Sequence, residues 1–129
     1  MTKKFAHIHN HSEFSMLDGL SSIELYIRET KRLGQDAIAI TDHGNMHAVI
    51  ELHNQAKAAG IHPIMGCEFY ATPFGTGYDN KDRKANHMLV LAQNQVGYQN
   101  MLVLTKNSYE FGFYYKPRIT ISDLEKYSE

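Results

Sequence analysis

This sequence of 129 residues lacks both long apolar runs and cysteine pairs. No stretch approaches the roughly 20 apolar residues that a membrane-spanning helix needs, so we expect no membrane segment. Cys67 is the only cysteine, which excludes an internal disulfide bond and is typical of the reducing cytoplasm. Residues 1–5 lead directly into histidines and do not resemble a secretory signal. We therefore expect a cytoplasmic protein.

An excess of positive charge is also absent. Thirteen basic and fourteen acidic residues give a formal net charge of −1, and no basic tail or patch stands out. Proteins that bind nucleic acid through its phosphate backbone usually carry such a patch. If DNA is a partner of this chain, a metal site or another protein segment must hold it.

Hydrophobic periodicity predicts alternating strands and helices. A capping-box pattern from Ser21 to Glu24 predicts a helix that ends near Gly34, and Asn45 is expected to begin a second helix that reaches Ala59. The other expected elements are strands at 5–9, 37–40, 62–70 and 87–92, a polar loop at 72–85, and helices at 96–107 and 121–127. This order predicts an α/β fold with a mainly parallel sheet and about four βα units.

A sheet of this size is expected to be open. A closed βα barrel typically needs about 250 residues, so the chain is expected to form a partial barrel. The last strand would then have an unpaired edge, which could allow edge-to-edge self-association.

Eight histidines are the most unusual part of the composition. His7, His9 and His11 alternate along the chain, so in an extended segment their side chains point to one face. Imidazole is the commonest nitrogen ligand for zinc, iron and manganese. A single histidine on a polar strand face would need no special explanation, but three within five residues favour a metal site.

Other candidate ligands lie at the ends of predicted strands. His43 follows the buried strand at 37–40, the position where α/β proteins gather their catalytic groups. Glu68 ends an apolar run, where a carboxylate is costly to bury without a partner such as a cation. Asp18 alone would be an ordinary turn aspartate, and His87 alone is only slightly better than a partly buried histidine.

Together these residues offer about four imidazoles and two carboxylates, with no set of thiolates. That is too many ligands for one structural zinc ion, and the mixture suits two or three divalent ions. Clustered ions hold a phosphoryl oxygen, activate water and stabilise the departing oxygen. The predicted chemistry is therefore metal-dependent phosphoester hydrolysis.

Several segments resemble the polymerase and histidinol phosphatase (PHP) family, in register from Phe5 to Tyr127. They are His9–Ser12, Met16–Gly19, Thr41–Asn45 and Gly60–Glu68. Gly97–Asn100 and Gly112–Ile119 are similar in particular to the PHP subfamily at the N-terminus of the bacterial DNA polymerase III alpha subunit. The family fold is a distorted βα (TIM-like) barrel with its metal cluster at the strand C-termini, so the resemblance implies the same fold here.

By position, the resemblance implies six metal ligands: His9, His11, Asp18, His43, Glu68 and His87. Of these, His9, His11, His43 and Glu68 are implied to be catalytic. The implied cofactors are two or three zinc, manganese or iron ions in the complete site. In family members with an intact site, the implied activity is 3′–5′ exonuclease proofreading, with the DNA 3′ end bound at the metals.

The other histidines are expected to lie outside the metal site. His7 is a neighbour of the first ligand pair, His47 and His53 are expected on the solvated face of the second helix, and His62 lies early in its strand. We interpret the last three as structural, and Cys67 as a small packed hydrophobic residue.

Two basic residues near the end of the chain are candidates for substrate binding. Lys116 and Arg118 could contact a phosphate, although a basic turn near the surface explains them equally well.

The resemblance is to the N-terminal portion of a PHP domain, which we assign to residues 1–129. The family domain continues to a further cysteine ligand and a late Asp-x-His pair, so we do not expect a complete trinuclear centre from this chain alone. The expected partners are the rest of the alpha subunit, a DNA-directed DNA polymerase (a nucleotidyltransferase of DNA replication), and other replisome proteins. Two alternatives stay open: a structural or partner-docking module without activity of its own, and a small-molecule PHP phosphoesterase.

Overall fold

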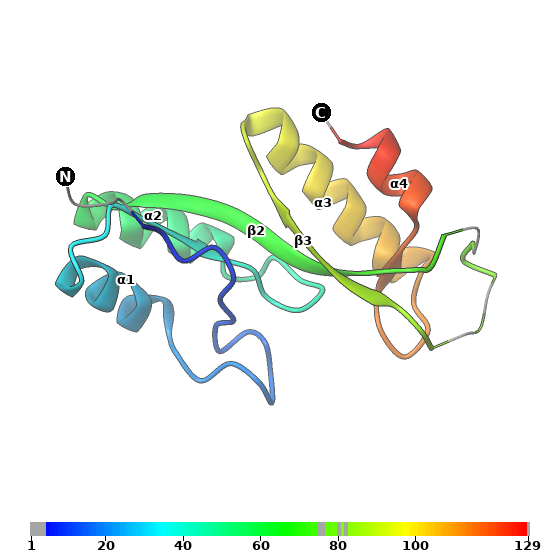
Figure 1. The fold of residues 1–129 in the computed structure, drawn as a ribbon, viewed down its shortest axis with the longest axis horizontal. Helices are drawn as coiled ribbons and strands as arrows, with labels where there is room; N and C mark the ends of the chain where they lie inside the picture. The colour runs from blue at the N-terminus through cyan, green and yellow to red at the C-terminus, as the bar shows by residue number, and fades with distance from the viewer. Residues whose placement is uncertain (1–4, 75–76, 80, 82, 129) are drawn as a thin grey trace.

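The computed structural model describes residues 5–74, 77–79, 81 and 83–128. Helices and strands alternate along much of this chain, as Figure 1 shows. In chain order the elements are α1 (Ile23–Arg32), β1 (Ala37–Ile40), α2 (Val49–Ala59), β2 (His62–Ala71), β3 (Asn86–Leu91), α3 (Gln95–Glu110), β4 (Arg118–Ile119) and α4 (Ile121–Lys126). None of the helices in this part of the chain has both the length and the hydropathy that a bilayer crossing requires.

The long strand β2 is the centre of the sheet. β1 pairs with its first half in parallel, and β3 pairs with its second half in antiparallel orientation. β4 is parallel to β2 at Tyr70 and Ala71, where β3 also pairs, so β3 and β4 occupy opposite edges of β2. Figure 1 shows β2 running through the middle of the molecule, with α1 and α2 near its beginning and α3 and α4 near its end.

The α/β class is confirmed, but the sheet is mixed and does not close into a barrel within the described residues. β3 is antiparallel because only the loop at 72–85 joins it to β2. A parallel strand would need a crossover connection, usually a helix, and the described residues of this loop form none. Among the described strands β3 pairs with β2 alone, so edge-to-edge self-association stays a prediction.

The predicted first strand, residues 5–9, is not a regular strand. Its only ladder contact is an isolated parallel bridge between His7 and Ile38. The segment nevertheless runs beside β1: Ala39 N donates to His7 O over 3.0 Å, and Thr41 N donates to Asn10 O over 2.8 Å. The Asn10 side chain donates to Ala39 O over 2.9 Å. In a regular ladder, a backbone amide would donate this hydrogen bond.

Two helix starts differ from the prediction. The N-cap of α1 is Ser22, one residue after the predicted Ser21. α2 begins at Val49 rather than at Asn45, because the Asn45 side chain accepts a hydrogen bond from His47 N and holds a turn before the helix. Side chains such as asparagine offer the backbone this alternative to helix.

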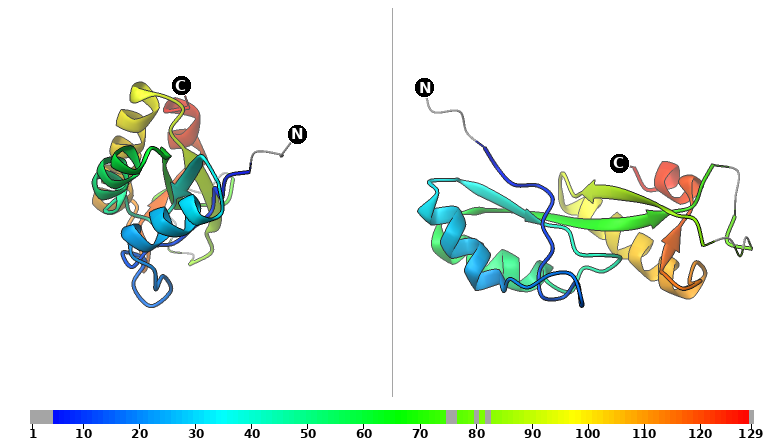
Figure 2. Two further views of the ribbon diagram at one scale, coloured as in Figure 1. Left: turned by 90° about the vertical axis from the view of Figure 1, so that its left-hand side faces the viewer. Right: turned by 60° about the horizontal axis from the view of Figure 1, so that its bottom comes forward.

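Side chains of β2 alternate between two different environments. The strand β1 and the helices α1 and α2 form a first core. Residues Cys67, Phe69 and Ala71 face a second core, which is built mainly with α3, β4 and α4 and also includes Val49 of α2. Met65 packs against both cores. The even-numbered residues Glu68 and Tyr70 therefore point to the opposite face, where the segment preceding α1 crosses the sheet (Figure 2).

Candidate metal centre

The Glu68 carboxylate lies at the centre of a cluster of imidazoles. Glu68 is only 2% exposed, and its Oε2 lies 2.5 Å from His9 Nε2 and 3.2 Å from His11 Nε2. Its Oε1 lies 3.2 Å from His43 Nδ1 and in contact with His87 Nδ1. One buried carboxylate thus faces two pairs of imidazoles, one pair at each oxygen.

Asp18 joins the cluster through His43. Asp18 Oδ2 lies 2.5 Å from His43 Nε2, on the side of the ring away from Glu68. The His11 and His43 rings are stacked, with centroids 4.0 Å apart and planes 13° apart. Among the residues that the structure describes, three overlapping groups could each hold a cation: His9, His11 and Glu68; His11, Asp18 and His43; and His43, Glu68 and His87.

The backbone brings His43 beside Glu68 where β1 ends. Glu68 N donates to Asp42 O over 3.0 Å, and Gly44 N donates to Glu68 O over 2.9 Å, so the 42–44 segment continues the β1 edge of β2. Glu68 therefore lies within β2 rather than at its end, and it is β1 that terminates at the cluster.

The antiparallel direction of β3 explains the position of His87. In the β2–β3 register His87 is paired with Tyr70, and Glu68 is paired with Leu89. Because β3 runs against β2, residues at the start of β3 meet the last residues of β2. A parallel β3 would have placed His87 at the opposite end of the sheet.

Buried atoms without hydrogen-bond partners test whether cations fit this cluster. His11 Nδ1, His43 Nδ1 and Glu68 Oε1 are buried, and none makes a hydrogen bond within the described part of the chain. The 3.2 Å contact between His43 Nδ1 and Glu68 Oε1 is close, but it lacks hydrogen-bond geometry. Such atoms are rare in folded proteins and call for an explanation such as a bound ion. The donor set fits divalent cations.

The electrostatics of the cluster favour the protonation states that metal ligands need. Burial, reinforced by the neighbouring His43, lowers the pKa of His11. Burial acts to raise the pKa of Glu68, but the His9 hydrogen bond and the charges of nearby histidines outweigh it and hold that pKa below its ordinary value. The hydrogen bond to His43 likewise lowers the pKa of Asp18. Cations bind neutral imidazole and ionised carboxylate.

The structure thus brings together all six side chains that the family resemblance singled out, although their role as ligands stays a prediction. His7, His47, His53 and His62 are exposed and belong to none of the three groups. His47 lies in the turn before α2 rather than on the helix. Cys67 is fully buried in the core, and burial raises the pKa of its thiol.

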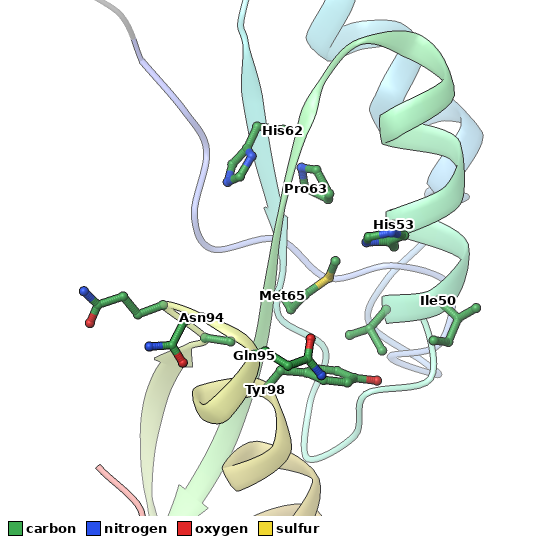
Figure 3. Close-up of a pocket in the computed structure, with 11 residues that line it drawn as sticks. Ile50, His53, His62, Pro63, Met65, Asn94, Gln95 and Tyr98 are labelled. Carbon is green, nitrogen blue, oxygen red and sulfur yellow. The ribbon is translucent and has the colours of Figure 1, made fainter. Parts of the chain in front are cut away.

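His53 and His62 instead line a separate pocket of about 350 Å³ between α2, the start of β2 and the start of α3 (Figure 3). Its walls include Ile50, Met65 and Tyr98, and it contains none of the six clustered residues.

The two basic candidates occupy different surroundings. Lys116 is exposed, and its Nζ lies 4.3 Å from the centroid of the Tyr70 ring. The Tyr70 ring stacks on the His43 ring with centroids 6.2 Å apart, and it meets the His87 ring edge-on with centroids 5.1 Å apart. Arg118 is 3% exposed, and its guanidinium donates to Gly112 O and Tyr78 O. Lys116 therefore lies at the margin of the cluster, whereas Arg118 braces the turn before β4.

Tyr70 and Asp42 are the neighbours of the cluster that sequence reasoning missed. Tyr70 is two residues after Glu68 in the same strand, so period-two alternation could have placed it on the same face. Burial, with the nearby charge of Glu68, raises the pKa of Tyr70, so its hydroxyl stays protonated. Asp42 gave no comparable signal, because its importance depends on contacts with a distant loop.

Comparisons with protein families and with known sequences relate the whole chain to known proteins. The sequence profile of the PHP domain matches residues 7–129. DNA polymerase III subunit alpha of Borreliella burgdorferi is 45% identical over 129 residues, which cover 98% of this chain and 11% of that protein. The same subunit of Treponema pallidum is 42% identical over 128 residues, which cover 97% of this chain and 11% of that protein. The chain thus spans about a tenth of the length of these relatives.

Solved structures show the same fold. A protein of Bifidobacterium adolescentis assigned as a metal-dependent phosphoesterase superposes with a TM-score of 0.57 at 21% identity, covering 80% of this chain and 32% of that one. An amidohydrolase of Chromobacterium violaceum superposes with a TM-score of 0.54 at 18% identity, and the superposition covers 81% of this chain and 34% of that protein. At these identities the likeness concerns the fold alone. The profile match over residues 7–129 establishes that the chain belongs to the PHP domain family.

Proposed function

We propose that this chain is the N-terminal portion of the PHP domain of a DNA polymerase III alpha subunit, and that its cluster is part of a site that, when complete, hydrolyses phosphodiesters at a DNA 3′ end. The observation that carries the proposal is the convergence of six potential ligands from separate segments, with the buried Glu68 in contact with four of them. The similarity to alpha subunits supports the link to replication, which would place the chain in the cytoplasm with DNA and replisome proteins.

The residues that would hold divalent cations are His9, His11, Asp18, His43, Glu68 and His87. Imidazole and carboxylate ligands suit zinc, manganese or iron, and the overlapping groups leave room for two or three ions. Bound cations of this kind supply Lewis-acid polarisation of a phosphoryl oxygen and activation of water. Glu68 would orient both sides of the cluster, because each of its oxygens faces a different pair of histidines.

Lys116 would attract the phosphate. Its ammonium group lies over Tyr70 beside His43 and His87, at the exposed margin of the cluster. A lysine at this place adds positive charge where a phosphodiester would approach, without being a metal ligand itself. The neutral hydroxyl of Tyr70 could donate a hydrogen bond to the same phosphate.

His43→Ala tests the catalytic role. Two of the three groups share His43, so we expect the variant to lose most Mn²⁺-dependent release of nucleotides from a 5′-labelled single-stranded oligonucleotide. The matched control is His53→Ala, because His53 is exposed on α2 and lies outside the cluster. Measurable nuclease activity that is equal in His43→Ala and the wild-type chain would contradict the proposal. A large fall in melting temperature with no activity in either protein would favour the structural or docking module.

Lys116→Met tests the phosphate contact. We expect a higher KM for the oligonucleotide with little change in kcat, since the lysine would bind the phosphate before and during the reaction. Lys126→Met is the control, because Lys126 also lies over a tyrosine ring, that of Tyr127, but on α4. Substrate choice separates the remaining alternative: faster hydrolysis of a phosphate monoester than of the oligonucleotide would favour a small-molecule phosphoesterase.

A further inference from the structure

We infer that Asp42 is the positioning residue of the group formed by His11, Asp18 and His43. The inference rests on the proposed function for its metal chemistry, but its geometric part concerns the chain alone. Asp42 is 1% exposed and belongs to none of the three potential cation groups. Its side chain is therefore a buried charge whose role the proposed reaction leaves unexplained.

The Asp42 carboxylate is bonded by the loop that carries the first ligands. Ser12 N donates to Oδ1 over 2.7 Å, Ser12 Oγ donates to Oδ2 over 2.7 Å, and Ser15 Oγ donates to Oδ1 over 2.6 Å. A buried carboxylate is costly unless such donors surround it, and charge-assisted hydrogen bonds are among the strongest in proteins. The charge of Asp42 thus fixes the loop to the end of β1.

The bonded residues stand next to the potential ligands along the chain. Ser12 follows His11, and Ser15 lies three residues before Asp18 within a turn in which Asp18 N donates to Ser15 O over 3.0 Å. Ser15 Oγ also accepts a hydrogen bond from His43 N over 3.1 Å. One carboxylate therefore connects, through two serines, to all three members of this group.

The backbone of Asp42 links the same unit to β2. Asp42 O accepts a hydrogen bond from Glu68 N over 3.0 Å and a weaker one from Cys67 Sγ at 3.6 Å. Asp42 thus contacts the loop with its side chain and the central strand with its carbonyl group. Removing the side-chain contacts should release the loop while leaving His43 and Glu68 beside each other.

The stacking of His11 on His43 depends on how the loop is held against the end of β1, so it can be used to detect a change in the position of the loop. Their centroids are 4.0 Å apart, and the two rings come from segments that are joined through Ser12, Ser15 and Asp42. If Asp42 merely stabilised the fold, its loss would lower the melting temperature without changing this contact in molecules that remain folded. A positioning role predicts that the ring contact and the cation affinity change together.

The test uses Asp42→Asn and Ser15→Ala in the full 129-residue chain. Asp42→Asn puts an amide nitrogen in place of one carboxylate oxygen and removes the charge that three donors share, whereas Ser15→Ala removes the hydroxyl that bridges Asp42 to His43 N. In both variants we expect the nuclear Overhauser contacts between the His11 and His43 rings to weaken in the metal-free protein. We expect Mn²⁺ affinity to fall about 10- to 100-fold, the usual effect of losing a residue that orients metal ligands.

The double variant and a control separate positioning from stability. Because Asp42 and Ser15 act in one network, the loss in Mn²⁺ affinity of the double variant should be less than the sum of the two single losses on a free-energy scale. Asp123→Asn, which disrupts the cap of α4, is the control: it should lower the melting temperature but leave Mn²⁺ affinity and the ring contact unchanged.

Wild-type ring contacts and wild-type Mn²⁺ affinity in folded Asp42→Asn and Ser15→Ala would overturn the inference. If Asp42→Asn does not fold, Ser15→Ala decides by the same two measurements. If the wild-type chain binds no Mn²⁺, the proposed function fails, and the ring contact in the metal-free variants still decides whether Asp42 positions this group.

Discussion

At the scale of single residues, Gly44 shows how tightly the turn beside the cluster is built. Its φ is +62°, and an added Cβ would lie 2.7 Å from Pro117 Cγ and 3.3 Å from Tyr70 Cε2. The left-handed backbone and the crowding act together in Gly44→Ala, so we expect a loss of about 2 to 4 kcal/mol in the free energy of unfolding. Urea denaturation of the metal-free chain measures it.

Gly60→Ala is the matched control for this prediction. Gly60 has a similar φ of +74°, but an added Cβ would meet nothing within 4 Å. Only the cost of the left-handed backbone remains, so the free energy of unfolding should fall by about 1 to 2 kcal/mol. Equal losses in the two variants would show that crowding against Pro117 and Tyr70 contributes nothing.

The residues of the candidate site differ in how far sequence could reveal them. The alternation of His9 and His11, and the place of His43 after a buried strand, are local patterns that point to the cluster directly. Asp18 and His87 carry no such pattern, because each reaches the cluster through a turn or a strand direction that is set elsewhere. Asp42 is the extreme case, since only packing shows that two serines of a distant loop bond to it.

At the scale of elements, the short helix α4 depends on its capping box. Asp123 N donates to Thr120 Oγ1 over 3.1 Å, while Asp123 Oδ2 accepts from Thr120 N over 2.9 Å and from the Tyr78 hydroxyl. Burial acts to raise the pKa of Asp123, but the hydrogen bonds from Thr120 and Tyr78 outweigh it and hold that pKa below its ordinary value of 3.8.

This depressed pKa predicts a pH-dependent contribution to stability. The ionised Asp123 stabilises the fold above pH 3.8, and the contribution disappears as the pH falls through the lower folded-state value. At pH 6, Asp123→Asn should therefore cost about 1 to 2 kcal/mol, and the difference from wild type should shrink at pH 3. Urea denaturation at both pH values measures it. Glu125→Gln, on the exposed side of α4, should show neither effect, and a pH-independent cost in Asp123→Asn would contradict the assignment.

The elements that sequence predicted best are those whose own residues determine them. The buried strand at 37–40 agrees with β1, and the helix predicted at 96–107 lies within α3, Gln95–Glu110. The antiparallel direction of β3 was not predicted, because strand order alone does not distinguish a hairpin from a crossover. The segment at 5–9 was mispredicted as a strand for a different reason: the Asn10 side chain replaces part of the backbone ladder along β1.

At the scale of the whole molecule, the residues of the cluster come from the elements of both cores. His43 follows β1 and precedes α2, which belong to the first core. Glu68 and His87 come from the half of the sheet that packs against the second core, with α3 and α4. A cation shared by His43, Glu68 and His87 would therefore connect the two halves of the molecule through their side chains.

This arrangement predicts that Mn²⁺ stabilises the entire chain rather than one loop. A ligand that binds only the folded state at a concentration of 100 times its Kd adds about 2.7 kcal/mol to the free energy of unfolding, which for a chain of this length raises the Tm by roughly 10 °C. Scanning calorimetry should show one transition that moves upward as a unit. In Glu68→Gln the shift should largely vanish, since Glu68 contributes to two of the three groups, whereas His53→Ala should keep it. A Tm shift of equal size in Glu68→Gln would place the stabilising ion outside the cluster. Two transitions of which only one moves would show that the two cores unfold separately and that Mn²⁺ stabilises only one of them.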